Sequence, residues 1–270
     1  MTPFDASGAA ALLHRARRAA ARAPLAALPP GLHPETLAQG VEAQVALAGL
    51  QGAAAPAGFK IGATARRMQE YLGLAGPAAA FMGRDGLHGS GSTLSYAGLL
   101  RPGVECELAV CLAHDLPPEP CTPEQARAAT GEAMAAIEIV ENRYQVLAEF
   151  GAPALVADQV FHAAAILGEP YAGWRGLDLC AVAGRVLVDG AARGSGFGRD
   201  LLGDPMQALA WLAGSAEAAA FGGLRAGQIV MLGSVCPPVW LDGPGHVTVE
   251  FPPFAPVSLT LVLPSPSAFG

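Results

Sequence analysis

The chain has 270 residues, of which 52% are hydrophobic and 14% are charged, and its formal net charge is −7 at pH 7. A chain of this length and composition can bury a sizeable core, so we expect one large domain or a body with a smaller lobe. The negative charge argues against nucleic acid as a partner, because contacts to a phosphate backbone need a basic surface.

No apolar run approaches the roughly 18 residues of a membrane span, and arginines repeatedly interrupt the Ala-rich start of the chain. We therefore expect no membrane segment and no cleavable signal peptide. The five cysteines are scattered without C-x-x-C spacing. A disulfide framework or a zinc site is not expected, and the cytoplasm is the predicted location.

In chain order, the first predicted elements are helices. Residues 5–51 carry apolar and Ala positions at helical spacing, interrupted by the prolines of "LPPGLHPET" (28–36), after which Thr36 can start a second helix. This pattern predicts a helical lobe over residues 1–57.

Residues 58–270 are predicted to form a single body in which strands dominate. Its expected elements are a strand within 101–118, a helix that begins near Thr122 and runs into an extended segment by 144, a hairpin from 178 onward with an Asp189-Gly190 turn, a helix over 204–222, and two closing strands over 227–235 and 246–263.

Two acids stand one residue apart in the strand "RPGVECELAV" (101–110), namely Glu105 and Glu107. Side chains at i and i+2 of a strand point to the same face, about 7 Å apart. Two desolvated carboxylates in one space must share a cation, or one must take up a proton. A solvent-facing strand edge would show the same spacing, and periodicity does not choose between these readings.

A third acid, Glu138, is isolated in the apolar run "AIEIVENRY" (136–144), where an unpaired charge would cost several kcal/mol. With the E-x-E pair it would form an oxygen-only site, which suits Mg²⁺ or Mn²⁺ better than zinc. Lys60 lies between apolar neighbours in "GFKIG" and is either a surface lysine with a buried stem or a basic group of this site.

Six segments together resemble the 2-keto-4-pentenoate hydratase and 4-oxalocrotonate decarboxylase group of the fumarylacetoacetate hydrolase superfamily. They follow the order and spacing of that group over nearly the whole chain: "GFKIGAT" (58–64), "RPGVECELAV" (101–110), "AIEIVENRY" (136–144), "VAD" (156–158), "LLGDPMQALAWLA" (201–213) and "LRAGQIVMLGSV" (224–235). The combination of G-x-K-x-G, E-x-E and a later Glu is specific, although no single element would suffice.

The resemblance implies that Glu105, Glu107 and Glu138 bind Mg²⁺ or Mn²⁺ and that Lys60 is the basic residue of the pocket. It also implies an α+β fold, with a curled mixed β-sheet (β-roll) body behind a small N-terminal helical lobe, assembled as a homo-oligomer. Such folds host several chemistries, so the site must decide the reaction.

An ion held by three carboxylates keeps positions open for the C1 carboxylate and C2 oxygen of a 2-oxo or 2-hydroxy acid, where an enolate develops. Lys60 would relay a proton during enol–keto tautomerisation. Asp158 is expected to orient a water or Lys60, or else to cap a helix. Arg143 is expected to neutralise a second substrate carboxylate, or to pair with Glu141 on the surface.

Three segments depart from the pattern of the group, and all of them lose polar groups or gain bulk. Residues 78–80 are Ala where an Asp-containing element is usual, Gln159 and Phe161 replace Asn and Ser of V-A-D-N-A-S, and Leu232 replaces Thr or Ser before the Gly of the late strand. These changes predict that Phe161 and Leu232 contribute to a more apolar pocket, and that the substrate carries a hydrocarbon tail or ring. His88 and His162 are expected to be structural.

The sequence therefore predicts a metal-dependent lyase, with hydration of a 2-hydroxy-2,4-dienoate or 2-oxo-4-enoate ahead of decarboxylation. A 2-oxo acid decarboxylase or a carbon–carbon bond hydrolase of the same superfamily is the alternative within enzymes. From another class, the chain could be a non-catalytic partner subunit, a reading that the intact acids and lysine disfavour.

Overall fold

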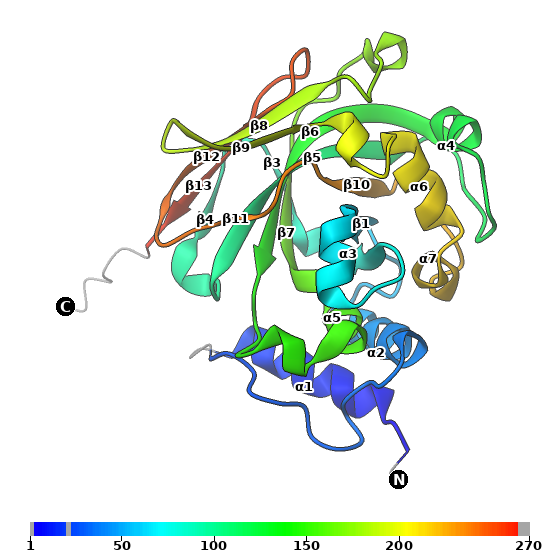
Figure 1. Cartoon of the computed structure of the whole chain (residues 1–270), viewed down its shortest axis with the longest axis vertical. Helices are drawn as coiled ribbons and strands as arrows, with labels where there is room; N and C mark the ends of the chain where they lie inside the picture. The colour runs from blue at the N-terminus through cyan, green and yellow to red at the C-terminus, as the bar shows by residue number, and fades with distance from the viewer. Residues whose placement is uncertain (1–2, 20–22, 264–270) are drawn as a thin grey trace.

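The computed structural model describes residues 3–19 and 23–263 and contains two β-sheets with helices gathered at one end and along one flank (Figure 1). The helices are α1 (Ala6–Arg18), α2 (Leu37–Leu50), α3 (Arg66–Leu72), α4 (Pro123–Ala129), α5 (Gly151–Ala157), α6 (Pro205–Ala213) and α7 (Ala216–Ala220). None of the helices in the described residues is long and apolar enough to cross a membrane.

The N-terminal helices form where the sequence predicts them, because each starts at a capping side chain. The Asp5 carboxylate accepts a hydrogen bond from the Gly8 N–H, and Thr36 and Gln39 form a reciprocal capping box at the start of α2. Both helices lie beside α5 at the lower end of the molecule in Figure 1. Residues 1–57 were predicted as a helical lobe of a single structural unit. Helix α5, which the sequence analysis did not predict, packs against α2 and shares a hydrophobic cluster with α1 and α2.

The larger sheet has the strand order β2-β1-β10-β5-β6-β7-β3, with β11 paired to β5, and the smaller sheet has the order β4-β13-β12-β8-β9. The strands of the larger sheet are β1 (Gly58–Gly62), β2 (Ala78–Met82), β3 (Leu87–Gly89), β5 (Pro102–Leu112), β6 (Thr130–Glu141), β7 (His162–Leu167), β10 (Ile229–Ser234) and β11 (Val239–Trp240). Those of the smaller sheet are β4 (Ser92–Ser95), β8 (Ala183–Val188), β9 (Ala191–Phe197), β12 (Gly245–Glu250) and β13 (Val257–Val262).

Both sheets are mixed, because β1 with β10, β3 with β7 and β4 with β13 are parallel while the other pairs are antiparallel. The larger sheet curls until β2 lies against β7. The predicted fold, a curled mixed sheet preceded by a helical lobe, is confirmed.

The two faces of β5 and β6 have different environments, as expected for strands whose side chains alternate. One face presents Val104, Cys106 and Leu108, with the odd-numbered residues of β6, to the main core shared with β12 and β13. The other face lies inside the curl, where a separate cluster gathers small and flexible side chains from five strands: Met82, Ala109, Met134, Ala136, Ala165 and Met231. Glu105, Glu107 and Glu138 belong to this inner face.

Two of the later predictions need correction. The helix predicted over 204–222 is interrupted at Gly214, after which Ser215 caps the separate helix α7. The final strand predicted over 246–263 is a pair, β12 and β13, because prolines in the connecting segment cannot donate to a β-ladder.

Candidate metal centre

The three predicted acids meet on neighbouring strands. Glu105 of β5 lies directly opposite Glu138 of β6, and Glu107 lies two residues further along the same face of β5. One carboxylate oxygen from each lies within 4.8 Å of one from each of the others. The antiparallel register of two long strands therefore brings together residues that are far apart in the sequence.

This cluster is inside the protein, so the alternative reading of the E-x-E pair as a solvent-facing edge is wrong. The side chains of Glu107 and Glu138 are both 0% exposed, and only Glu105 is partly exposed. Glu107 Oε1 and Glu138 Oε2 are buried without a hydrogen-bond donor when all three acids are ionised. Buried oxygens of this kind are costly, and a bound cation would satisfy them.

An irregularity in β10 gives Glu107 its one donor. The register of β10 on β5 shifts between Met231 and Ser234, which leaves the Gly233 N–H free to donate to Glu107 Oε2 at 2.9 Å. Gly233 has φ +108°, and a Cβ there would lie 2.5 Å from Thr64 Cγ2. Only glycine fits this position without rearrangement.

Lys60 and His162 both approach Glu138 on the same oxygen. Lys60 Nζ lies 3.2 Å from Glu138 Oε1, and His162 Nδ1 lies 2.9 Å from it. Lys60 is 2% exposed, so the surface-lysine alternative is wrong. It is also the only lysine among the sixteen Lys and Arg residues of the chain.

The pKa values show how the acids divide the charge in the absence of a cation. Burial, followed by the charge of Glu138, raises the pKa of Glu105 to about 8, and the same causes raise the pKa of Glu107 well above its usual value. Burial also acts on Glu138, but Lys60 and His162 outweigh it and lower the pKa of this acid to about 2. Burial lowers the pKa of His162, so a neutral imidazole donates from Nδ1 to the ionised Glu138.

These residues fit a divalent ion. Three carboxylates share one space, and among the described residues Lys60 is the basic side chain that forms an ion pair with one of them, Glu138. The raised pKa values of Glu105 and Glu107 come from burial and from the charges of the neighbouring acids, and a divalent cation would favour their ionised forms. The donor set is oxygen-only, as Mg²⁺ and Mn²⁺ prefer.

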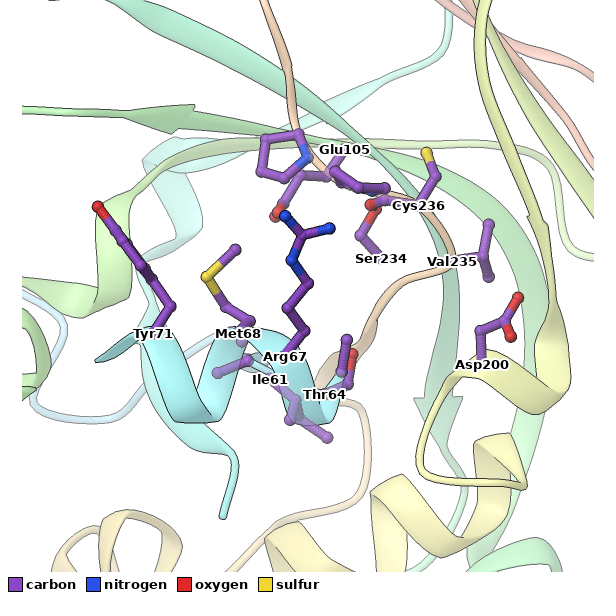
Figure 2. Close-up of a pocket in the computed structure, with 15 residues that line it drawn as sticks. Ile61, Thr64, Arg67, Met68, Tyr71, Glu105, Asp200, Ser234, Val235 and Cys236 are labelled. Atoms are coloured by element: carbon purple, nitrogen blue, oxygen red, sulfur yellow. The ribbon is translucent and has the colours of Figure 1, made fainter. Parts of the chain in front are cut away.

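A pocket of about 720 Å³ opens onto this cluster through Glu105 (Figure 2). Its other walls come from the end of β1 and the segment that joins it to α3, from α3 itself, from Asp200, and from residues 234–238 at and after the end of β10. Most of these side chains are apolar, among them Met68, Tyr71 and Val235. In Figure 2 Arg67 extends from α3 into the pocket, and no other Lys, Arg or His lines it in the described residues.

Asp158 and Arg143 lie in a separate buried network instead of in the pocket wall. Asp158 accepts from Arg143 Nε and from Arg17 Nε, both at 2.8 Å, and Arg143 Nη1 donates to Glu141 at 2.7 Å. The predicted pairing of Arg143 with Glu141 is thus present, but in the interior and not on the surface, since both side chains are 3% exposed. Tyr144 Oη completes the network by donating to Asp158.

Phe161 and Leu232 are likewise absent from the pocket lining. Leu232 is fully buried in the main core, and the Phe161 ring contacts the rings of Tyr144 and Trp240. Gln159, Val160 and Phe161 form a left-handed turn, with φ of 56°, 48° and 67°. This conformation costs L-residues roughly 1–2 kcal/mol each, so tertiary contacts must hold the turn.

Three residues of the site and its surroundings escaped the sequence analysis as functional candidates. His162 was treated as structural, although its ring contacts a predicted metal ligand. Arg67 had a usable signal, because it follows the G-x-K-x-G element by a few residues. Arg17 had none, since only the folded chain brings α1 to Asp158.

The fold and the site together define a curled-sheet protein with a buried carboxylate centre at the floor of a pocket. The model of the fumarylacetoacetate (FAA) hydrolase C-terminal family matches residues 61–262, and the chain belongs to this family.

Two relatives and one solved structure narrow the comparison. The chain is 33% identical over 204 residues to the 2-keto-4-pentenoate hydratase of Burkholderia vietnamiensis strain G4, which covers 72% of this chain and 77% of that protein. It is 31% identical over 208 residues to the 2-hydroxyhexa-2,4-dienoate hydratase of Comamonas testosteroni, with the same coverages. The 4-oxalocrotonate decarboxylase of Pseudomonas putida G7, complexed with magnesium and adipate, superposes with a TM-score of 0.86 at 20% identity, over 97% of this chain and 100% of that one. The likeness to hydratases indicates an enzyme of the lyase type.

Proposed function

We propose that this protein is a divalent-metal-dependent hydratase that adds water to a 2-hydroxy-2,4-dienoate or its 2-oxo-4-enoate tautomer. The observation that carries the proposal is the buried cluster of Glu105, Glu107 and Glu138, which is short of positive charge and opens onto a pocket. The names of the two relatives support dienoate-type substrates. The magnesium of the decarboxylase complex supports the choice of cation.

Glu105, Glu107 and Glu138 would hold Mg²⁺ or Mn²⁺. When bound, the ion supplies positive charge to the C1 carboxylate and C2 oxygen of the substrate as electron density shifts onto that oxygen. The Gly233 N–H keeps Glu107 in one orientation, and His162 does the same for Glu138. Such fixed partners keep the carboxylates in position before substrate arrives.

Lys60 is suited to moving the proton. Its Nζ lies at the cluster, between Glu138 and the backbone of Gly62, where a Cβ would lie 3.4 Å from it. Gly62 itself lines the pocket, so the absence of a side chain there leaves the ammonium a short path toward bound substrate. An arginine would remain protonated throughout, whereas lysine can give up and regain a proton at Nζ.

The pocket walls define the substrate more loosely. Apolar side chains such as Met68 and Tyr71 suit a hydrocarbon chain, and they exclude water from the reacting carbons. Arg67 extends from α3 into the pocket, and we assign it to a negatively charged group of the substrate. Asp158 and Arg143 are fully engaged with each other and their partners, so we assign them to the framework of the site.

The alternatives differ in the bond that breaks. The decarboxylase and carbon–carbon hydrolase readings use the same acids and Lys60, and they would be recognised by release of carbon dioxide or of two smaller acids. A non-catalytic partner subunit has no need of a buried acid cluster beside its only lysine.

We further propose that the enzyme works in the cytoplasm as a homo-oligomer, which its scattered cysteines and its family resemblance support.

The test is calorimetric titration of Mn²⁺ into metal-stripped protein, with and without oxalate as a mimic of the chelating end of the substrate. Mn²⁺ should bind, oxalate should tighten the binding, and Glu107→Gln should abolish it while Glu119→Gln, a change at an exposed acid, should not. The bound enzyme should then remove the ultraviolet absorbance of a 2-hydroxydienoate. Absence of Mn²⁺ binding in the unmodified protein would overturn the proposal in favour of a non-catalytic role.

A further inference from the structure

Arg17 of the N-terminal helix α1 contacts the segment that leads into β7, the strand beside β6. Its guanidinium donates three hydrogen bonds into the segment that precedes β7: Nε to Asp158 Oδ1 at 2.8 Å, Nη2 to the Asp158 carbonyl at 2.7 Å, and Nη1 to the His162 carbonyl at 3.2 Å. Arg17 thus spans both ends of the left-handed turn over residues 159–161. It lies outside residues 61–262, the part of the chain that the family model matches.

Arg143 also donates hydrogen bonds to this segment. It donates to Asp158 Oδ2 at 2.8 Å and to the Asp158 and His162 carbonyls at 3.1 and 3.5 Å. Two guanidinium groups therefore converge on the carbonyls that begin and end the turn. Gln51, at the end of α2, donates a hydrogen bond to the Gln159 side chain at 3.0 Å. Side chains from both α1 and α2 therefore contact this turn.

The residue that leaves the turn is His162, whose Nδ1 lies 2.9 Å from Glu138 Oε1. The position of the imidazole depends on its backbone, and that backbone is fixed by three consecutive left-handed residues that are not glycine. Such a conformation persists only when surrounding contacts hold it in place. Loss of the hydrogen bond from Arg17 to the His162 carbonyl should therefore displace the imidazole ring that orients Glu138.

We propose that Arg17 is a positioning residue of the metal centre. It holds the turn over residues 159–161, and the turn sets the position of the His162 ring that orients Glu138. The helical lobe is on this view part of the site, although none of its residues lines the pocket. The inference rests on the proposed metal-binding role of Glu138, and it adds a dependence of metal affinity on a residue of α1.

The experiment compares the dissociation constant of Mn²⁺, measured by calorimetry, for the full-length protein and its variants at equal folded content by circular dichroism. Arg17→Ala should weaken Mn²⁺ binding by about 10- to 100-fold, the usual effect of removing an outer partner of a metal ligand. Arg17→Lys should give a smaller loss, because a single ammonium cannot reproduce three directed bonds. Arg15→Ala, an exposed arginine on the same helix, is the matched control and should leave the constant unchanged.

A double-mutant cycle tests the route of the effect. If Arg17 acts through His162, Arg17→Ala added to His162→Ala should weaken Mn²⁺ binding no further than His162→Ala alone. Additive losses would overturn the proposed route, and an unchanged constant in Arg17→Ala, whatever its melting temperature, would overturn the inference as a whole. Should Arg17→Ala not fold, Arg17→Lys decides by the same criterion. If the unmodified protein does not bind Mn²⁺, the proposed function fails together with this inference. If the unmodified protein binds Mn²⁺ and Arg17→Ala binds it equally well, only this inference fails.

Discussion

Two buried groups of charged residues lie close together in this protein, and they are balanced in opposite ways. In the network around Asp158, two carboxylates face two guanidinium groups with directed hydrogen bonds. In the cluster around Glu138, three carboxylates face one ammonium and a neutral imidazole. The first group is a charge-balanced network that stabilises the fold, whereas the second group has more negative than positive charge.

The difference between these two groups shows why burial of a charged side chain does not by itself indicate a ligand-binding or catalytic site. Asp158 has a lowered pKa, because the charges of Arg143 and Arg17 outweigh the effect of burial. Glu107 has a raised pKa, because burial and the charges of the neighbouring acids outweigh the charge of Lys60 and the Gly233 N–H. An acid that the protein leaves unbalanced is the one available to a ligand. His162 joins the two groups through its backbone on one side and its ring on the other.

The largest effect is expected at the unbalanced centre, from Lys60→Ala. Loss of the proton-moving group should lower kcat by about 10²- to 10⁴-fold, while Mn²⁺ binding should persist because all three carboxylates are retained. Steady-state kinetics and calorimetry on the same preparation provide the check. An enzyme that lost Mn²⁺ binding together with activity would show that Lys60 holds the cluster together and does not move a proton.

At the balanced network the expected effect is on stability. Asp158→Asn removes the shared partner of two buried guanidinium groups and should lower the free energy of unfolding by about 3–5 kcal/mol at pH 7. Because the folded-state pKa of Asp158 is lowered, its contribution is present above the unfolded-state pKa of 3.8 and is lost as pH falls through the folded value. Urea unfolding should show the gap between wild type and variant closing below about pH 4. A variant of unchanged stability but lower kcat would favour the original interpretation of Asp158 as a catalytic residue.

The smallest expected effect concerns the pocket wall. Arg67→Ala should raise KM by about tenfold, or about 1.4 kcal/mol, with little change in kcat, since the guanidinium is assigned to binding and not to the chemical step. Arg66→Ala is the matched control, because Arg66 pairs with Glu70 and is exposed. Equal kinetics for the two variants would mean that Arg67 contacts no substrate.

Local patterns in the sequence predicted individual helices and strands, whereas the family resemblance implied the curled sheet and the shared role of the three acids. Apolar spacing predicted α1, and Thr36 and Thr122 predicted the starts of α2 and α4. The isolated acid of β6 indicated a partner for the E-x-E pair. The register that places Glu138 opposite Glu105 could not be read from either strand alone, since it depends on the pairing of the two in the sheet.

The roles of Asp158 and Arg143 were harder to predict for a physical reason. Asp158 follows an apolar run, whereas Arg143 follows Glu141 and Asn142, and neither setting distinguishes a pocket residue from a member of an internal ion pair. Their distinguishing partner, Arg17, is 141 residues from Asp158. Arg67 was overlooked because α3 has only 7 residues, which is too short for apolar spacing to reveal a helix.

The presence of a single lysine, Lys60, has a practical consequence. A lysine-specific protease finds one susceptible peptide bond in the entire chain, and this bond lies within β1, which is paired to β2 on one side and to β10 on the other. Cleavage requires those strands to separate. The appearance of two fragments, divided after residue 60, therefore reports the opening of the sheet at the strand that carries Lys60.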